Sequence, residues 1–556
     1  MAEKLSTGSG GSLSKDGEKG DVAYDIHQMR SASIGDVIEM VDTTHGQFHR
    51  SFTPHQVHII SLGSNIGSGL FIGTGAALAA AGPGNMVIAY LLVCSCVWAV
   101  LQTLSEMTIA FPTSGNYIDY ADRWVDPALA FGAGLAEWLG WTAIVAAEAS
   151  FFDILIQFWA NESFPKAASL TIFVVITCAI FVMPNTVFAW FEYGTSLIKI
   201  GLFILIILLS LAIVCGAGPE GYVHDGSTWT DLPAFKNGFS GFGRAALLAC
   251  WAVGDQIFIG IMGGEAQNPR FSMGHATKLV PYRVIFVYMA CVIFITVLIR
   301  SDNDQLLGGS GVTASPFVLA IQSVKIPYVS SILNAGIMFG ILAISAESIY
   351  LSSRILRTMA VQRLIPIWIA QVDRRGRPVR SLVITCLSAV VLTYINMSAG
   401  GVVALNWFVS ITSASFFINW MIVAFTSWRF HKTLAAQNDP LFSGLYAWKS
   451  SMWPLAPVWL MSICVLLLIC CFYVGAKPPG STGTTANNFF QYTIGILLIF
   501  SMTAAYKLIF RTPFRDPKTA DLLTGRRKLT PEDIEQLDAY YRLPTWRRFL
   551  TYVKLW

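Results

Sequence analysis

The sequence predicts an all-α polytopic membrane protein with twelve transmembrane helices. Hydrophobic residues make up 54% of the 556-residue chain and charged residues only 13%, and the mean hydropathy is +0.57. These values are typical of polytopic membrane proteins. Apolar segments long enough to cross a bilayer, which takes about 20 residues, lie near residues 57–80, 86–110, 128–158, 166–184, 191–216, 243–265, 280–300, 329–353, 380–397, 402–428, 453–475 and 489–510.

The placement of Lys and Arg predicts which side of the membrane each loop faces. Seven arginines, from Arg354 to Arg380, lie at the end of the eighth span and in the loop after it, and Arg270 and Lys278 follow the sixth span. The basic residues after the last span include Arg526, Arg527, Lys528, Arg547 and Arg548. Loops of the opposite parity are poor in Lys and Arg, so the positive-inside rule places both ends of the chain in the cytoplasm.

Composition divides the chain into a tail, a helical domain and a second tail. Residues 1–52 are polar and rich in Gly and Ser, without a cleavable signal pattern, and are expected to be disordered and cytoplasmic. Residues 53–510 form the twelve-helix domain, and residues 511–556 the second tail. In this tail, residues 530–533 (TPED) match a helix start with a capping-box variant. Its last twelve residues mix Trp and Phe with Lys and Arg, which predicts either a helix on the inner membrane surface or packing against the protein's own loops.

Glycine interrupts the first span, within the sequence IISLGSNIGSGLFIGTGAALAAAGPG that starts at Ile59. Each glycine costs a helix about 1 kcal/mol relative to alanine. Non-helical backbone at membrane depth is tolerated only where it is buried in protein or lines a cavity. We therefore expect a broken helix whose free N–H and C=O groups bind a small polar ligand. The alternative is close helix packing through small residues such as Gly69 and Gly73.

The sixth span is interrupted in the same way, by Gly254, Gly260, Gly263 and Gly264. Spans one and six are each the first helix of a five-helix block, at residues 57–216 and 243–428, and spans eleven and twelve follow at 453–510. Matching broken helices in two blocks are the pattern of an inverted-repeat transporter. The predicted fold is thus a 5+5 inverted repeat with helices 1 and 6 broken, plus two extra helices.

Six segments, in order along the chain, carry a resemblance to a known family. They are GSNIGSGLFIGTG (63–75), the stretch from Glu106 to Asp126-Pro127, GEAQNPR (264–270), SSRILRTMAVQRLIP (352–366), DRRGRP (373–378) and NWFVSITSASFFINWMIVAFTSWRF (406–430). From about His55 onward the chain resembles fungal amino-acid permeases of the amino acid/polyamine/organocation superfamily. The resemblance implies a LeuT-like fold and a plasma-membrane importer that couples L-amino acid uptake to protons by alternating access.

A zwitterionic amino acid needs both of its charges met in a low-dielectric site. The first helix restarts near Ser68, and its positive end suits a carboxylate, so Gly67, Ser68 and Gly69 are assigned to that group. The ammonium is assigned to carbonyls freed by the two breaks, at Ser64, Ile66, Gly254 and Asp255. Gln256 and Phe258 in the second break, with Trp251 before it, are expected to line the side-chain pocket.

Three ionisable residues inside the spans are candidates for proton coupling: Glu148, Lys199 and Glu347. Such residues are functional hypotheses by default. Glu148 and Lys199 match the family. For Lys199 the resemblance implies that its ammonium lies beside the first helix break, where sodium-coupled relatives hold an ion. Glu347 stands where the family commonly has Asn. The alternatives are structural hydrogen bonding for the two glutamates and snorkelling to the interface for Lys199.

Asp255 departs from the family, which usually places a glutamate nearby, and a buried carboxylate there must be paired, protonated or bound to substrate. The alternative puts Asp255 in an exposed turn. Together with Glu148 and Glu347, it favours cationic or neutral substrates over acidic ones.

The main alternative to a transporter is an amino-acid-binding nutrient sensor of the same fold that moves little substrate. An enzyme is not expected, because no nucleophile–base motif or phosphate-binding loop is recognisable, and a channel fits two broken helices less well. The ten cysteines lie in apolar runs and seven of the eight histidines in tails or loops, so neither a metal nor another cofactor is expected.

The expected partners are the amino-acid substrate, the proton and the lipid bilayer, without nucleic acid. Two sequons, at Asn161 and Asn396, fall in loops predicted to lie outside and are candidate glycosylation sites. Lys4, Lys15 and Lys19 in the first tail are candidate ubiquitin acceptors.

Overall fold

The structure is a computed structural model that describes residue 63 and residues 66–548, apart from 114, 162, 183–184, 219–220, 255–268, 307–314, 326–327, 374–375, 398–400, 445, 482 and 528. All regular structure in these residues is helical. The elements are η1 (Gly69–Gly73), α4 (Thr74–Ala110), α5 (Asn116–Trp124), α6 (Pro127–Ala160), α7 (Lys166–Val182), α8 (Asn185–Val214), η2 (Ser227–Trp229), α9 (Gly238–Val253), α11 (Pro269–Leu298), α12 (Pro316–Ser323), α13 (Val329–Val361), η4 (Ile367–Ala370), α14 (Val379–Ile395), α15 (Gly401–Gln437), η5 (Leu441–Ser443), α16 (Leu455–Ala476), α17 (Ala486–Phe510) and α18 (Pro531–Arg542).

Eight helical segments in the described part of the chain are long and apolar enough to cross a membrane, which confirms the prediction of an all-α multi-pass protein. Three shorter apolar helices accompany them, at Lys166–Phe181, Gly238–Val253 and Val379–Ile395. Some helices extend well beyond the predicted spans. Helix α11 begins at Pro269, eleven residues before the predicted seventh span, although its apolar part, Thr277–Leu298, agrees with that span. Helix α13 continues to Val361, eight residues beyond the predicted eighth span, and α15 to Gln437, nine residues beyond the predicted tenth span.

The first two predicted spans meet at a sharp kink, not across a loop. Gly82, inside α4, has φ 73° and ψ 169°, a conformation that side chains with a Cβ adopt only with strain. Pro83 follows and has no N–H to leave unpaired, and the N–H of Gly84 donates to the Ala234 carbonyl at 2.8 Å. The kink therefore needs no separate connecting segment, and the predicted spans 57–80 and 86–110 lie on either side of it.

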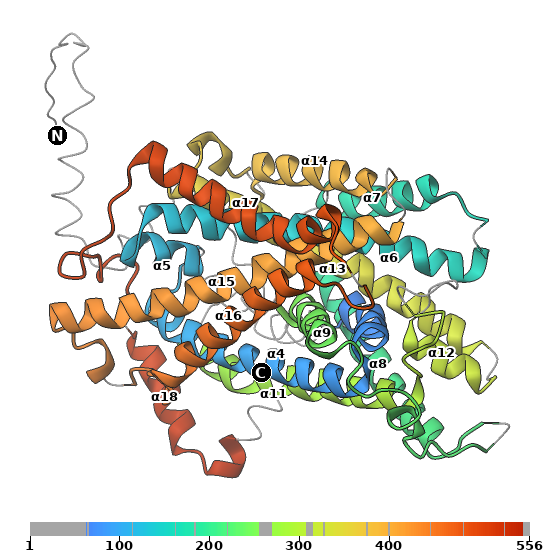
Figure 1. Ribbon diagram of the computed structural model, residues 1–556. Coiled ribbons are helices and arrows are strands. Elements are labelled where there is room, and N and C mark those ends of the chain that lie inside the picture. The colour runs from blue at the N-terminus through green and yellow to red at the C-terminus, as the bar shows by residue number, and fades with distance from the viewer. Residues whose placement is uncertain are drawn as a thin grey trace, which may run out of the picture.

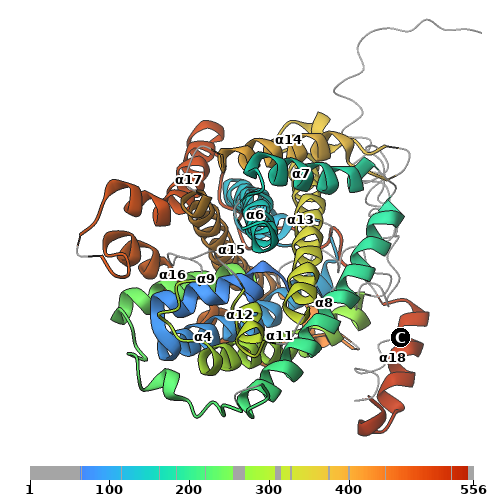
Figure 2. The same ribbon diagram turned by 90° about the vertical axis from the view of Figure 1, so that its right-hand side faces the viewer.

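Two groups of helices enclose the centre of the molecule (Figures 1 and 2). In one group α4 packs against α9 and α11, and in the other α6 packs against α13, α14 and α15. Helices α16 and α17 pack against each other and against α15 at the periphery. Element η1 contacts α9 and α12, so the start of the first described helix lies between the two groups.

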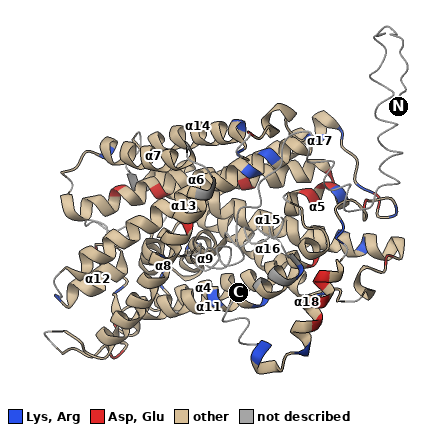
Figure 3. Cartoon of the chain, turned by 180° about the vertical axis from the view of Figure 1, so that it is seen from behind, with Lys and Arg blue, Asp and Glu red and all other residues tan. Residues whose placement is uncertain are grey.

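The first part of the second tail packs against the protein's own loops, whereas residues 549–556, most of the segment with two predicted alternatives, lie outside the described residues. The N–H of Arg515 donates to the Val125 carbonyl at 2.8 Å, and the N–H of Arg527 to the Ala110 carbonyl at 3.0 Å. Helix α18 begins with the predicted capping box, in which Thr530 and Asp533 exchange side-chain and backbone hydrogen bonds. Figure 3 shows many of the charged residues around α5 and α18, while the bodies of the long helices are largely uncharged.

Candidate functional site

The predicted break in the first span is present. Ile66 and Gly67 are non-helical, between a helical residue at Gly63 and the restart of the helix at Ser68. The N–H groups of Leu70 and Phe71 donate to the Gly67 carbonyl at 3.0 and 2.9 Å. Those of Ser68 and Gly69 therefore stand at the open end of the helix, the position that suits an anion.

The first turn after the break is a π-helix, Gly69–Gly73, which the sequence did not predict. Single π-turns occur frequently at functional sites. Glycine also allows this turn to approach α9 closely, since a Cβ at Gly69 would lie 2.7 Å from Ala252 Cα. The ligand-site and close-packing interpretations of this glycine are therefore compatible.

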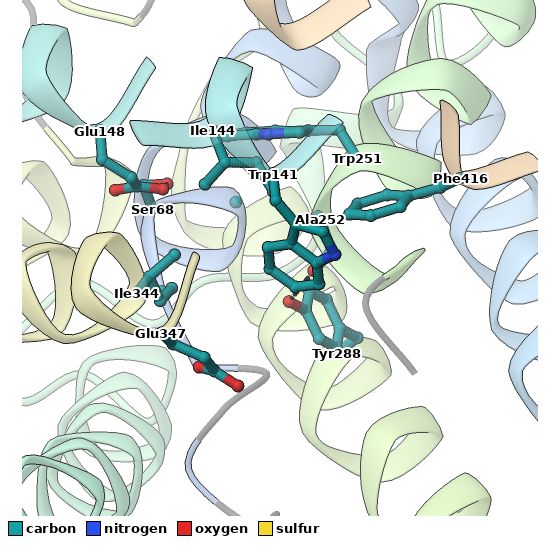
Figure 4. Close-up of a pocket in the computed structure, with 12 residues that line it drawn as sticks. Ser68, Trp141, Ile144, Glu148, Trp251, Ala252, Tyr288, Ile344, Glu347 and Phe416 are labelled. Atoms are coloured by element: carbon teal, nitrogen blue, oxygen red, sulfur yellow. Dashed lines mark hydrogen bonds between the residues drawn. The ribbon is translucent and has the colours of Figure 1, made fainter. Parts of the chain in front are cut away.

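A small cavity with a volume of about 40 Å³ opens at this break. Six elements supply its lining, and Figure 4 shows the side chains from these elements converging on one centre. The lining residues are Gly67, Ser68, Gly69, Trp141, Ile144, Glu148, Trp251, Ala252, Tyr288, Ile344, Glu347 and Phe416. Six of them, Gly67, Ser68, Gly69, Glu148, Trp251 and Glu347, are among the residues singled out from the sequence.

Glu148 of α6 connects the cavity to the helix break. The Ser68 hydroxyl donates a short hydrogen bond to Glu148 Oε1, and the two side chains point toward each other in Figure 4. Glu148 is 1% exposed, and its Oε2 has no hydrogen-bond partner among the residues that the structure describes. A buried carboxylate oxygen of this kind can accept a proton or a hydrogen bond from a ligand.

Lys199 of α8 is fully buried and forms an ion pair with Glu192, with 3.6 Å between Nζ and Oε1. Burial within the bundle contradicts the snorkelling alternative. A Cβ at Gly340 would lie 3.8 Å from Lys199 Cγ and 3.9 Å from the Ile66 carbonyl oxygen. The Lys199 stem therefore runs beside the helix break, as the resemblance implied.

Several sequence-predicted residues lie away from the cavity or outside the described part. Ile66 is 2% exposed and lies beside Lys199 rather than in the cavity lining. Gly254 ends α9 against Phe416, since a Cβ there would lie 2.2 Å from Phe416 Cδ2. Ser64, Asp255, Gln256 and Phe258 lie outside the described residues.

The two sequons differ in their surroundings. Asn161 is exposed at the end of α6. Asn396 is fully buried, and its Nδ2 donates to the Ala146 carbonyl at 3.0 Å. The nitrogen that would carry a glycan is thus engaged inside the bundle.

Sequence reasoning missed two further buried carboxylates, Glu137 and Glu192. Glu137 of α6 accepts a hydrogen bond from the Trp141 indole at 2.8 Å and another from the Asn419 amide of α15, so it fixes a cavity-lining ring. Trp141 and Glu148 are seven residues apart, as are Glu192 and Lys199, so each pair lies on one helix face two turns apart. These spacings could have revealed Trp141 and Glu192 from the sequence. No comparable local signal marks Tyr288, whose hydroxyl donates to the Ala252 carbonyl at 2.5 Å.

Fold and site together define a multi-pass membrane protein with a small, largely apolar cavity at an interrupted helix, into which Ser68, Glu148 and Glu347 bring polar groups. Comparison with known proteins places it more closely: the chain belongs to the amino acid permease family, whose model matches residues 56–518. Members of this family are transporters, not enzymes.

Fungal permeases match nearly the whole chain. The amino-acid permease inda1 of Hypocrea atroviridis is 29% identical over 514 residues, which cover 91% of this chain and 89% of the relative. The general amino acid permease AGP1 of Saccharomyces cerevisiae is 29% identical over 521 residues, 90% of this chain and 81% of the relative. The S-adenosylmethionine permease GAP4 of Candida albicans is 29% identical over 490 residues, 88% and 80% respectively.

Proposed function

We propose that this protein is a secondary active transporter that imports L-amino acids across the plasma membrane by proton symport and alternating access. The observation that carries the proposal is the buried cavity in which the restart of the first helix, at Ser68, meets the Glu148 carboxylate. Both termini lie in the cytoplasm in this proposal, as the distribution of Lys and Arg predicts.

The proposed architecture is the predicted one of twelve spans, with two five-helix repeats and two further helices. It is supported by the eight long helical segments, of which Gly69–Ala110 is divided at Gly82, and by the three shorter apolar helices. Helix 1 is interrupted at Ile66–Gly67. Helix α9 ends at Val253, immediately before the glycine-rich stretch in which the second break is proposed.

In the proposed binding mode, the substrate carboxylate takes the N–H groups at Gly67, Ser68 and Gly69. The ammonium takes the carbonyls of Gly254 and Asp255 at the end of α9. The side chain then faces the largely apolar surface of Trp141, Ile144, Trp251 and Phe416. Glu148 and Glu347 line the same cavity, so their negative charge disfavours acidic substrates and favours neutral or cationic ones.

Glu148 is the proposed carrier of the coupled proton, because it is bonded to Ser68 of the substrate site. A proton on this carboxylate removes a negative charge from the cavity and changes how the Ser68 hydroxyl is engaged, which links proton binding to substrate binding. The Lys199 ammonium, buried beside the break and paired with Glu192, takes the place of the ion that sodium-coupled relatives hold there.

Uptake of labelled amino acids in permease-deficient cells tests this function and separates transport from sensing. We expect saturable uptake that rises as external pH falls and is abolished by a protonophore. Competition by each of the twenty amino acids then defines the substrate. Binding of amino acid to the purified protein without any uptake would contradict the transporter and favour the sensor.

A further inference from the structure

A second cavity, separate from the one at the helix break, lies between α11, the connection before α16, and α18 with the residues that follow it. Its volume is about 290 Å³. It is lined by Arg270, Gly274, His275, Lys278, Trp448, Leu537, Tyr540, Tyr541, Thr545 and Arg548. These include four basic residues and, among the described lining residues, no acidic one, so the cavity is an electropositive site.

Neighbouring contacts hold the basic side chains in place around this cavity. Arg270 donates from Nε to the Tyr446 carbonyl at 2.8 Å, and Arg548 donates from Nε to the Leu543 carbonyl at 2.7 Å. The Arg548 guanidinium also lies 5.8 Å from the Tyr541 ring centre. Planar guanidinium groups fixed in this way suit phosphate oxygens, which they can bind in pairs.

Aromatic rings join α18 to the rest of the cavity wall. His275 meets Tyr540 edge to face at 5.1 Å, and Tyr446 stacks on Tyr541 at 5.4 Å. The nearby acid, Asp538, accepts a hydrogen bond from the Tyr446 hydroxyl and is not part of the lining. The cavity therefore keeps its positive character although α18 itself carries acidic residues.

Its position relates the cavity to the membrane surface. The apolar part of α11 that can cross a membrane begins at Thr277, so Lys278 stands at the start of that segment, on the side that the charge distribution predicts to be cytoplasmic. The exposed rings of Tyr541 and Trp546 are residue types enriched at membrane interfaces. The phosphates of lipid headgroups lie at this level.

We propose that this cavity binds the phosphate groups of a polyphosphorylated inositol headgroup, with the membrane phosphoinositide as the favoured source over a soluble inositol phosphate. Arg270, Lys278 and Arg548 contact the phosphates, and His275 supplies a further donor. Three cations, two of them held by neighbouring contacts, match a headgroup with several phosphates better than a headgroup with a single one. A bound headgroup joins α18 to α11, so it fastens the second tail to the membrane domain.

The test uses the purified full-length protein in detergent and measures equilibrium binding of short-chain phosphatidylinositol bisphosphate, inositol trisphosphate and short-chain phosphatidylcholine. We expect the inositol lipid to bind and phosphatidylcholine not to bind. Tighter binding of the lipid than of inositol trisphosphate identifies the membrane source, and equal binding identifies a soluble source of the same phosphate chemistry. Equal binding of phosphatidylcholine and the inositol lipid would overturn the proposal.

The double variant Lys278→Gln/Arg548→Gln should weaken binding of the inositol lipid by about tenfold or more, because it removes two charged contacts. The matched control is Arg547→Gln, which removes a neighbouring charge that stacks on Trp546, outside the cavity. Unchanged binding in the double variant, or an equal loss in the control, would overturn the proposal. If the double variant unfolds, the single exposed change Lys278→Gln gives the decisive reading, with an expected loss of severalfold. Because this assay contains no transport step, its failure leaves the proposed transport function untouched.

Discussion

Replacing Gly69 with alanine tests whether the close approach of η1 to α9 sets the geometry of the proposed substrate cavity. A Cβ at Gly69 would lie 2.7 Å from Ala252 Cα and 2.8 Å from Ala252 Cβ, whereas carbon atoms in contact are about 3.5–4.0 Å apart. The nearest atom belongs to the backbone of α9, so no side-chain rotation relieves the overlap. The two helices must separate by roughly 1 Å.

The expected cost follows from this overlap. Overpacking in a tight core costs about 1–3 kcal/mol, and about 1.4 kcal/mol is a tenfold change in an equilibrium constant. We therefore expect Gly69→Ala to lower the initial rate of amino-acid uptake by about tenfold or more, at an equal amount of protein at the cell surface. The matched control is Gly340→Ala, where the nearest atom to the new Cβ is Lys199 Cγ at 3.8 Å, an ordinary contact that should leave uptake nearly unchanged.

The assay is the initial rate of labelled amino-acid uptake in permease-deficient cells, divided by the amount of surface protein determined by labelling. Wild-type uptake by Gly69→Ala would refute the reasoning that this contact shapes the cavity. An equal loss of uptake in Gly340→Ala would show that any methyl group added near the break is harmful. That result would also refute the reasoning that the Gly69 contact shapes the cavity.

Four further predictions concern other parts of the chain. Glu148→Gln should flatten the pH dependence of uptake, measured between about pH 4 and 8 where carboxyl and imidazole groups titrate, and an unaltered profile would remove Glu148 from the coupling path. Thr530→Ala should destabilise α18 by about 1 kcal/mol through loss of its N-cap, seen as faster amide exchange confined to that helix. Although burial raises the pKa of Asp533, hydrogen bonds, first of all from the Thr530 backbone, bring that pKa below its usual 3.8. The stability that the ionised Asp533 carboxylate contributes is complete above pH 3.8 and is lost as pH falls through its lower folded-state pKa. Pepsin should therefore cut α18 faster below that folded-state pKa. Equal cutting rates above and below it would show that the pKa is unshifted. Any glycan removed by endoglycosidase should disappear in Asn161→Gln and persist in Asn396→Gln, and the reverse pattern would contradict the burial of Asn396.

The break in the first helix could be predicted from the sequence because its cause is local. Glycine weakens a helix wherever it stands, and five glycines fall between Gly63 and Gly75. The restart near Ser68 was expected for the same reason, whereas the hydrogen bond between Ser68 and Glu148 joins two segments 80 residues apart and was not predicted. The π-helical turn was not predictable, because it depends on the packing of η1 against α9 and not on its own residues.

The rest of the cavity depends on contacts between distant segments. The lining residues Ile344 and Tyr288 come from helices far from Ser68 in sequence, and nothing in their local pattern says which neighbour they face. Glu192 was overlooked because a carboxylate near the end of a membrane span is also expected at the membrane–water interface, so its position did not mark it as buried. Helices α11 and α13 exceed the predicted spans because apolar composition marks only the part of a helix that can cross the membrane, while the helix itself continues into more polar sequence.

Among the contacts that tie the tail to the membrane domain, two backbone hydrogen bonds flank α5. One is the hydrogen bond from Arg527 to Ala110, the last residue of α4, and the other runs from Arg515 to Val125, just after α5. Any rearrangement that shifts the end of α4 relative to the start of α6 must stretch or release one of these ties. A reporter attached beyond residue 548 would therefore register such a rearrangement without any probe being placed in the long apolar helices.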